Sequence, residues 1–108
     1  TITGDGEQRR DFTYVSDVVK ANLLAMEKCE KVSGKIFNIG CGENYSINDV
    51  VDMFGEDYPR EYIDKRKGEM RSTLCDLGLA YSAVGYQPTR DIEDYIQGFV
   101  ETERFLNE

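Results

Sequence analysis

A strand-like apolar run that passes through glycines into an amphipathic helix constrains the fold of this chain most strongly. The run is KIFNI, residues 35–39, and Gly40 and Gly42 close it. Such β-rich residues followed by glycines are typical of a buried strand that leads into a loop. After the loop, a Ser46-x-x-Asp49 capping-box pattern precedes apolar residues with helical spacing at Ile47, Val50, Val51 and Phe54. A strand, a loop and a helix in this order predict an α/β fold.

The other segments add short strands and helices to this unit. The opening residues 1–15 predict two extended pieces around a Gly4-Asp5-Gly6 turn, the second of them rich in strand-forming residues at 12–15. Ser16 is the expected N-cap of a helix that ends near residues 29–31. The remaining elements are a weaker strand at 61–64 and helices at about 76–84 and 91–105. The sequence therefore predicts one α/β domain, residues 1–108, in which short strands (an α+β-like mixture) accompany about four helices.

The residue inventory excludes several kinds of function. The chain has 108 residues, a net charge of -8, no histidine, and three widely spaced cysteines, Cys29, Cys41 and Cys75. Without histidine or a C-x-x-C pair, the common zinc sites cannot be built, so no metal is expected. No apolar run reaches the ~20 residues of a membrane span, and the acidic excess disfavours nucleic acid and anionic membranes as partners. These features predict a reduced, cytoplasmic protein.

Two glycine-containing segments invite a comparison with dinucleotide-binding loops. Gly40-Cys41-Gly42 follows the expected strand and precedes a helix, which is the context of a Rossmann phosphate loop. However, the third glycine of that fingerprint is missing, and no acidic residue closes a second strand about 20 positions on. Gly4-Asp5-Gly6 also lacks a third glycine and leads into a strand. We therefore interpret both segments as turns, with a dinucleotide loop at residues 40–42 as the alternative.

Arginines are better candidates for phosphate binding, because a guanidinium can grip a diphosphate with two donors and keep its charge. Arg9 and Arg10 precede the second extended piece, and Arg66 and Arg71 lie in the charged loop KRKGEMR with Glu69 between them. Glu69 could accept sugar hydroxyl hydrogen bonds or pair with a neighbouring arginine. The alternative for all of them is ordinary surface charge. Three tyrosines are candidates for catalysis, but none has a lysine four positions later, so core or interface packing is the expected role of Tyr14, Tyr45 and Tyr81.

Three longer segments, in their order along the chain, resemble a known family. They are GDGEQRRDFTYVSDVVKANLLAM, GKIFNIGCGENYSINDVV and KRKGEMRSTLCDLGLAYSAVGYQPTRDIEDYI. Together they are similar to the C-terminal part of the extended short-chain dehydrogenases/reductases, the family of the NAD-dependent nucleotide-sugar epimerases and dehydratases. The resemblance covers nearly the whole chain. It implies a C-terminal nucleotide-sugar (substrate) binding domain, with UDP-sugars as the expected substrate class.

The resemblance also implies a division of labour with another domain. Family members carry a Rossmann domain with G-x-x-G-x-x-G and a Tyr-x-x-x-Lys pair, and neither motif occurs in these 108 residues. NAD would therefore belong to the N-terminal domain of a parent enzyme, and no cofactor and no catalysis are expected for this chain alone. Apolar surface that faces the missing domain would be exposed, which is compatible with a homodimer. The alternative is a non-catalytic binding or dimerisation module derived from such an enzyme.

Carried over by motif, the resemblance assigns roles to five residues. Arg10 of RRDF and Arg66 match arginines that contact the nucleotide diphosphate, and Glu69 matches the acidic residue that holds the ribose. Arg71 matches the arginine of a G-E-x-R pattern. Thr73 stands where small residues are associated with N-acetylated sugars, which is compatible with N-acetylhexosamine substrates. The particular sugar and nucleotide, and the choice among epimerase, dehydratase and reductase, stay open at this point.

Overall fold

The computed structural model describes residues 1–107 and contains five helices and four two-residue strands. In chain order these are β1 (Ile2–Thr3), β2 (Arg9–Arg10), α1 (Val15–Glu27), α2 (Cys29–Val32), β3 (Tyr45–Ser46), α3 (Ile47–Phe54), β4 (Tyr62–Ile63), α4 (Gly78–Val84) and α5 (Ile92–Leu106). β1 pairs with β4 in parallel, and β2 pairs with β3 antiparallel. The mixed α/β character expected from the sequence is confirmed.

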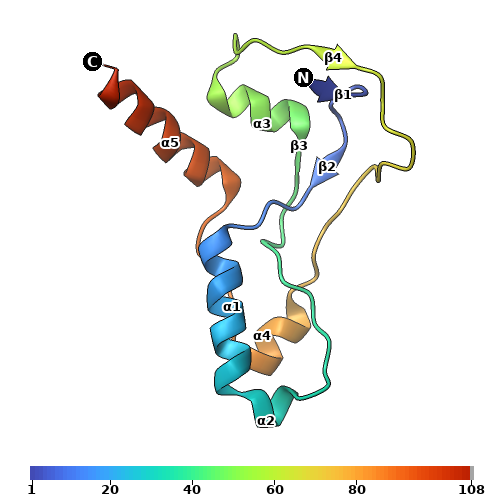
Figure 1. Ribbon diagram of the computed structural model, residues 1–108, viewed down its shortest axis with the longest axis vertical. Coiled ribbons are helices and arrows are strands. Elements are labelled where there is room, and N and C mark those ends of the chain that lie inside the picture. Colours follow the sequence, from blue (N-terminus) through green and yellow to red (C-terminus); the bar gives the residue numbers. More distant parts are fainter. Residues whose placement is uncertain (108) are drawn as a thin grey trace.

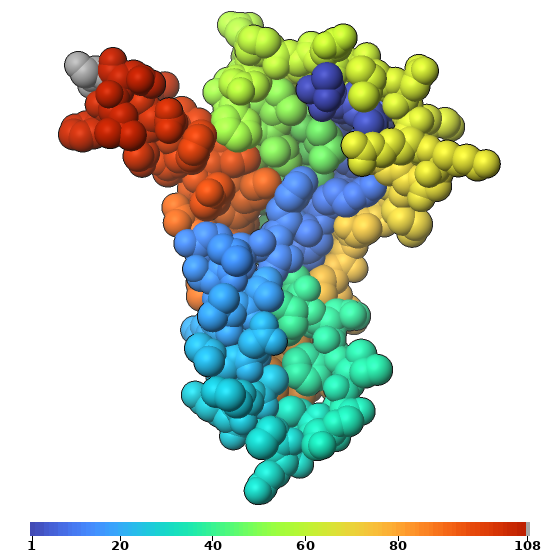
Figure 2. Space-filling model, in the orientation of Figure 1, coloured from blue at the N-terminus to red at the C-terminus, as the bar shows by residue number. Residues whose placement is uncertain are grey.

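The molecule is thin along one axis, and Figures 1 and 2 both view it along that axis. Its extents are 50 × 40 × 16 Å, and its radius of gyration is 16.9 Å, against ~13 Å for a compact domain of this length. Helices α1, α2 and α4 lie together at one end, whereas α3 and the β1–β4 pair lie at the other, and α5 projects to one side (Figure 1). No helix among residues 1–107 is both long and apolar enough to cross a bilayer.

The main core joins the three helices α1, α2 and α4. Its buried members come from these helices and from the segment after α4: Ala21, Val32, Ala80, Val84 and Tyr86. The Tyr86 hydroxyl donates to the Gly40 carbonyl at 2.8 Å, so the core also fixes the loop that leads towards α3. A second contact forms between α3 and α5, where Phe54 meets Phe99 edge to face with centroids 6.3 Å apart.

Local sequence rules determine α3, α4 and α5. The capping box of α3 is present, because the Asp49 amide donates to Ser46 Oγ at 3.0 Å and the Ser46 amide donates to Asp49 Oδ2 at 3.2 Å. α4 ends where Gly85 adopts a φ of 73°, a left-handed conformation that favours glycine. Asp91 caps α5 by accepting from the Asp94 amide at 2.9 Å. These three predicted helices are confirmed, as is the strand near 61–64.

The first predicted helix begins and ends differently. Its N-cap is Tyr14, which has extended backbone angles and makes no side-chain cap bond, so the assignment of this role to Ser16 was wrong. Ser16 already lies in the first helical turn. At the other end the backbone of Lys28 departs from helical angles, with φ -111° and ψ 27°, and divides the segment into α1 and a separate short helix, α2. The chain therefore has one helix more than expected.

Two strand predictions were also wrong: one predicted strand does not form, and another lies at different residues. Residues 35–39 form no strand, because within residues 1–107 this segment takes part in no backbone strand pairing. Phe37 and Ile39 nevertheless pack against the main core, while Ile36 between them is 88% exposed, so every second side chain points inward as in a strand. In the opening segment, the second strand is Arg9–Arg10 rather than residues 12–15. The reason is that its partner strand, Tyr45–Ser46, lies opposite Arg9 and Arg10.

Candidate functional site

A polar cavity of about 370 Å³ opens between the N-terminal segment and the loop that follows β4. The two segments are tied together at both ends. The Gly4 amide donates to the Ile63 carbonyl at 2.8 Å, and further along the Arg9 amide donates to the Arg71 carbonyl at 2.9 Å. Between these two hydrogen bonds the two segments separate, and the cavity lies between them. Its lining residues are Thr3, Gly4, Asp5, Gln8, Lys65, Arg66, Glu69, Met70 and Arg71.

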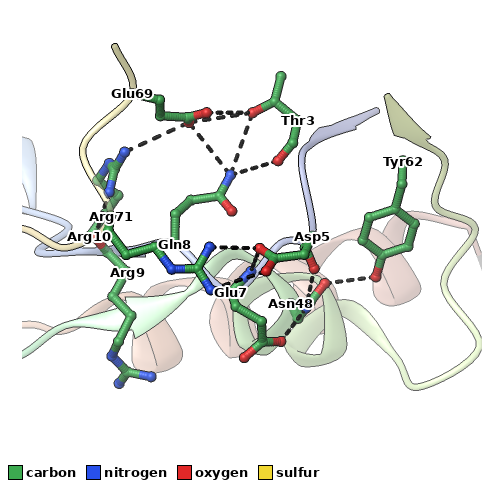
Figure 3. Close-up of polar contacts among 10 residues, drawn as sticks. All are labelled: Thr3, Asp5, Glu7, Gln8, Arg9, Arg10, Asn48, Tyr62, Glu69 and Arg71. Carbon is green, nitrogen blue, oxygen red and sulfur yellow. Dashed lines mark hydrogen bonds and ion pairs between the residues drawn. The ribbon is translucent and has the colours of Figure 1, made fainter. Parts of the chain in front are cut away.

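The carboxylate of Glu69 is the most densely contacted group of this cavity (Figure 3). Thr3 Oγ1 donates to both of its oxygens, at 3.3 and 3.1 Å, and Gln8 Nε2 donates to Oε1 at 3.5 Å. Arg10 adds an ion pair, with its Nη2 3.7 Å from Oε1. The side chains of Arg10 and Glu69 are 25% and 27% exposed, so the pair is partly shielded from water. A carboxylate held in this way still keeps acceptor capacity for a ligand.

Arg71 is engaged by another carboxylate at the mouth of the cavity. Its Nη1 and Nη2 donate to the two oxygens of Asp5 at 2.8 and 3.0 Å, which is a bidentate pair. The hydrogen bond from Arg71, with a further one from the Glu7 amide, lowers the pKa of the Asp5 carboxyl from 3.8 to about 2. Both side chains are well exposed, at 66% and 57%, so the pair contributes little to stability. It orders the turn at Gly4-Asp5-Gly6 instead.

Arg66 and Thr73 occupy different places. Arg66 is exposed on the cavity wall, and within the described part of the chain its guanidinium forms no ion pair. Thr73 lies outside this cavity. It lines a second hollow of about 350 Å³ together with Asp11, Gly40 and Cys75, and its Oγ1 accepts from the Asp11 amide at 3.3 Å. The structure therefore places Arg66, Glu69 and Arg71 on the lining of one cavity and Thr73 at another. Arg10 does not line the cavity, but its ion pair with Glu69 brings it next to this group.

The glycine loop at residues 40–42 does not present its amides to a phosphate. The amides of Cys41 and Gly42 donate to the Asp11 carboxylate at 2.8 and 2.9 Å, and the Cys75 amide donates to the same group at 3.2 Å. A dinucleotide loop needs such amides to point at the ligand. The turn interpretation fits this arrangement, and residues 40–42 do not fit an NAD site.

Of the tyrosines considered from the sequence, Tyr45 is the one that the structure makes unsuited to base catalysis. Tyr45 donates its hydroxyl to Asp91 at 3.0 Å, and burial together with this hydrogen bond raises the pKa of Tyr45 to about 12. A general base near neutral pH needs a lowered pKa. Tyr14 packs on Tyr95 with ring centroids 6.0 Å apart, whereas Tyr81 is 57% exposed. Within residues 1–107, no group of three or more His, Cys, Asp or Glu side chains could hold a metal.

Sequence reasoning missed the residues that organise the site. Thr3 and Gln8 contact Glu69, 66 and 61 positions away, and Asp11 accepts from amides 30, 31 and 64 positions away, so no local pattern marks these residues. Gln8 stands among charged residues in GEQRR and would be assigned to the surface, yet it is 6% exposed. The local signal among these residues is the Gly4-Asp5-Gly6 turn just before Arg9 and Arg10. Nothing in the sequence connects this turn to the loop at 64–71.

Known proteins are similar to this chain in both sequence and overall fold. The family model of the NAD dependent epimerase/dehydratase family matches residues 1–40. An uncharacterized UDP-glucose epimerase of Bacillus subtilis, YtcB, is 37% identical over 87% of this chain and 31% of its own length. UDP-glucose 4-epimerase of Thermotoga maritima, solved with UDP-glucose, superposes with a TM-score of 0.79 at 38% identity over 99% of this chain and 35% of that one.

A third protein has the same fold with a different sugar. UDP-glucuronic acid 4-epimerase of Bacillus cereus, solved with UDP-glucuronic acid and NAD, gives a TM-score of 0.83 at 30% identity, over 97% of this chain and 35% of that one. The fold thus falls in the class of Rossmann-type nucleotide-sugar epimerases. The chain belongs to the NAD-dependent epimerase/dehydratase family. It spans about a third of the length of the relatives it matches.

Proposed function

We propose that this chain is the C-terminal, substrate-binding portion of an NAD-dependent nucleotide-sugar epimerase or dehydratase, and that it binds the nucleotide diphosphate of a UDP-sugar. The observation that carries the proposal is a cavity lined by both Arg66 and Glu69, with Arg10 ion-paired to that same Glu69 although 56 positions separate the two arginines. Two guanidinium groups and one carboxylate complement a diphosphate and a ribose diol. The bound UDP-sugars of the related structures support the same ligand class.

Each residue has a role in this proposal that follows from its chemistry. Arg10 and Arg66 donate charge-assisted hydrogen bonds to the diphosphate, and Glu69 accepts from the ribose hydroxyls. Arg71 shapes the mouth of the cavity through Asp5 and is available to an anionic ligand that displaces this carboxylate. A nucleotide sugar is elongated, so its sugar would lie away from the diphosphate. The separate hollow at Thr73 is compatible with that end of the ligand.

Hydride chemistry is assigned to another domain. The NAD seen in a related structure supports NAD as the cofactor of the parent enzyme, where it accepts and returns a hydride. The amides of residues 40–42 are already bonded to Asp11, and no tyrosine of this chain has a lysine four positions on. We propose that an N-terminal Rossmann domain supplies the cofactor and the base, and that these 108 residues alone do not turn over substrate.

Calorimetric titration with UDP-glucose and UDP-N-acetylglucosamine tests the binding role. We expect the Arg10→Ala, Arg66→Ala double variant to lose at least about tenfold in affinity, because each hydrogen bond to a charged group contributes about 1.5–3 kcal/mol. Arg104→Ala is the matched control, since Arg104 lies on α5 and does not line the cavity. Equal affinity of the double variant and the control would refute the diphosphate site.

A non-catalytic dimerisation module is the second candidate, and one surface favours it. Val15, Val19, Leu23 and Met26 lie along one side of α1 and are 69%, 54%, 50% and 66% exposed. Contiguous apolar surface of this kind is typical of a protein interface. We expect sedimentation velocity to show concentration-dependent self-association that Leu23→Lys reduces. A monomer at all concentrations would leave this face to the proposed Rossmann domain alone.

A further inference from the structure

Gln8 is a buried polar side chain that touches the main carboxylate of the cavity. Gln8 is 6% exposed, although its neighbours in the sequence, Glu7 and Arg9, are both charged. Its Nε2 donates to the Thr3 carbonyl at 3.0 Å, to Thr3 Oγ1 at 3.4 Å and to Glu69 Oε1 at 3.5 Å. Burial of an amide is favourable only where such partners exist. The partners of Gln8 are therefore the reason for its position.

These bonds form a closed arrangement around Glu69 (Figure 3). Thr3 and Gln8 both donate to the carboxylate, and Gln8 also donates to Thr3, so each side chain limits the movement of the other two. Glu69 itself lies in the exposed loop between β4 and the Arg9–Ser72 bridge, where the backbone alone would leave its side chain free. A free glutamate loses rotamer entropy when it binds, whereas a preorganised one does not.

We propose that Gln8 is a positioning residue that acts through Glu69. It holds the Glu69 carboxylate with its remaining lone pairs directed into the cavity, so that the carboxylate can accept the hydroxyls of a nucleotide ribose. This inference rests on the proposed function. It goes further by naming the residue that makes the site selective for a ribose over a deoxyribose.

The first test measures the position of Glu69 without any ligand. Gln8→Met keeps the side-chain length and removes the donor, and Gln97→Met is the matched control on the exposed side of α5. We expect NMR relaxation of the Glu69 side-chain carbons to show larger motion in Gln8→Met than in the control. Unchanged motion would overturn the inference, whatever the chain binds.

The second test measures selectivity. Wild type should bind UDP about tenfold more tightly than 2′-deoxy-UDP, because the deoxy compound leaves a charged acceptor without one partner. We expect Gln8→Met to reduce this ratio towards one, while Gln97→Met keeps it. An unchanged ratio in Gln8→Met would overturn the inference. If wild type bound neither nucleotide, the proposed function would fall and the selectivity role with it, while the first test would still decide whether Gln8 orders Glu69.

A reciprocal variant covers the case in which Gln8→Met does not fold. Glu69→Ala changes an exposed loop residue and leaves Gln8 in place. The side-chain amide signals of Gln8 should shift and exchange faster with water in Glu69→Ala than in wild type, because one of their acceptors is lost. Amide signals that do not change would show that the two side chains are uncoupled and would overturn the proposal.

Discussion

Asp11→Ala should lower the free energy of unfolding by about 4 kcal/mol, because it removes the acceptor of three backbone amides at once. The Asp11 carboxylate accepts from Cys41, Gly42 and Cys75 at 2.8, 2.9 and 3.2 Å. These amides are partly buried, and each unsatisfied donor costs about 1–3 kcal/mol. Denaturation by urea, followed by far-ultraviolet circular dichroism, measures the loss. For a domain of marginal stability, such a loss approaches complete unfolding at ambient temperature.

Two variants separate this explanation from a general effect of losing charge. Asp11→Asn keeps one acceptor oxygen and should cost less than Asp11→Ala. Asp57→Ala removes the same charge from an exposed loop and should change stability by no more than about 0.5 kcal/mol. If Asp11→Ala and Asp57→Ala were equally stable, the Asp11 carboxylate would not hold the three segments together.

The position of Asp11 links stability to the candidate site. It follows Arg10 directly, and its carboxylate fixes both the loop at 40–42 and the chain at Cys75. The Arg9 carbonyl also accepts from the Thr73 amide at 3.0 Å, so the chain on either side of Arg10 is fastened to the segment that follows Glu69. The Arg10–Glu69 ion pair therefore depends on contacts outside the cavity. Partial loss of these contacts should weaken the proposed nucleotide binding before the chain unfolds.

The sequence predicted those elements whose causes are local. The capping box of α3 and the Asp91 cap of α5 each involve residues three positions apart, and Gly85 ends α4 by its own conformation. The strand expected at 35–39 failed for the opposite reason. Its composition is right for a strand, but a strand also needs backbone hydrogen bonds to a neighbouring strand, and within residues 1–107 this segment forms no such pairing. The two-residue pairing of Tyr45–Ser46 with Arg9–Arg10 is too short to produce an alternating pattern.

The candidate site shows the same limit. A family resemblance selected Arg10, Arg66, Glu69 and Arg71. The structure places the last three on the lining of one cavity and pairs Arg10 with Glu69, whereas Thr73 lies at another cavity. The groups that hold them could not be selected in this way. Asp5 engages Arg71 across 66 positions, and Gln8 reaches Glu69 across 61. Contacts between residues so far apart in the sequence depend on the parallel pairing of β1 with β4, and no local sequence pattern predicts that pairing.

Asp17→Ala should lower the free energy of unfolding by about 3 kcal/mol, because the buried Asp17 carboxylate accepts two hydrogen bonds from Thr89. Asp17 lies in the first turn of α1 and is 2% exposed. The Thr89 amide donates to Oδ2 at 2.9 Å, and the Thr89 hydroxyl donates to Oδ1 at 2.6 Å. Both donors would be left without an acceptor. Urea denaturation measures this loss as well.

A double-mutant cycle with Thr89→Val tests whether the two residues act as a pair. Thr89→Val removes the hydroxyl and keeps the amide, so it should cost about 1 kcal/mol alone and almost nothing further in the Asp17→Ala background. Additive losses would show that Asp17 stabilises the chain through other contacts. Since Thr89 lies two residues before the Asp91 cap, the pair also sets where α5 begins relative to α1. A coupled cycle would therefore mean that the buried carboxylate of α1 and the segment just before α5 stabilise the fold as a pair.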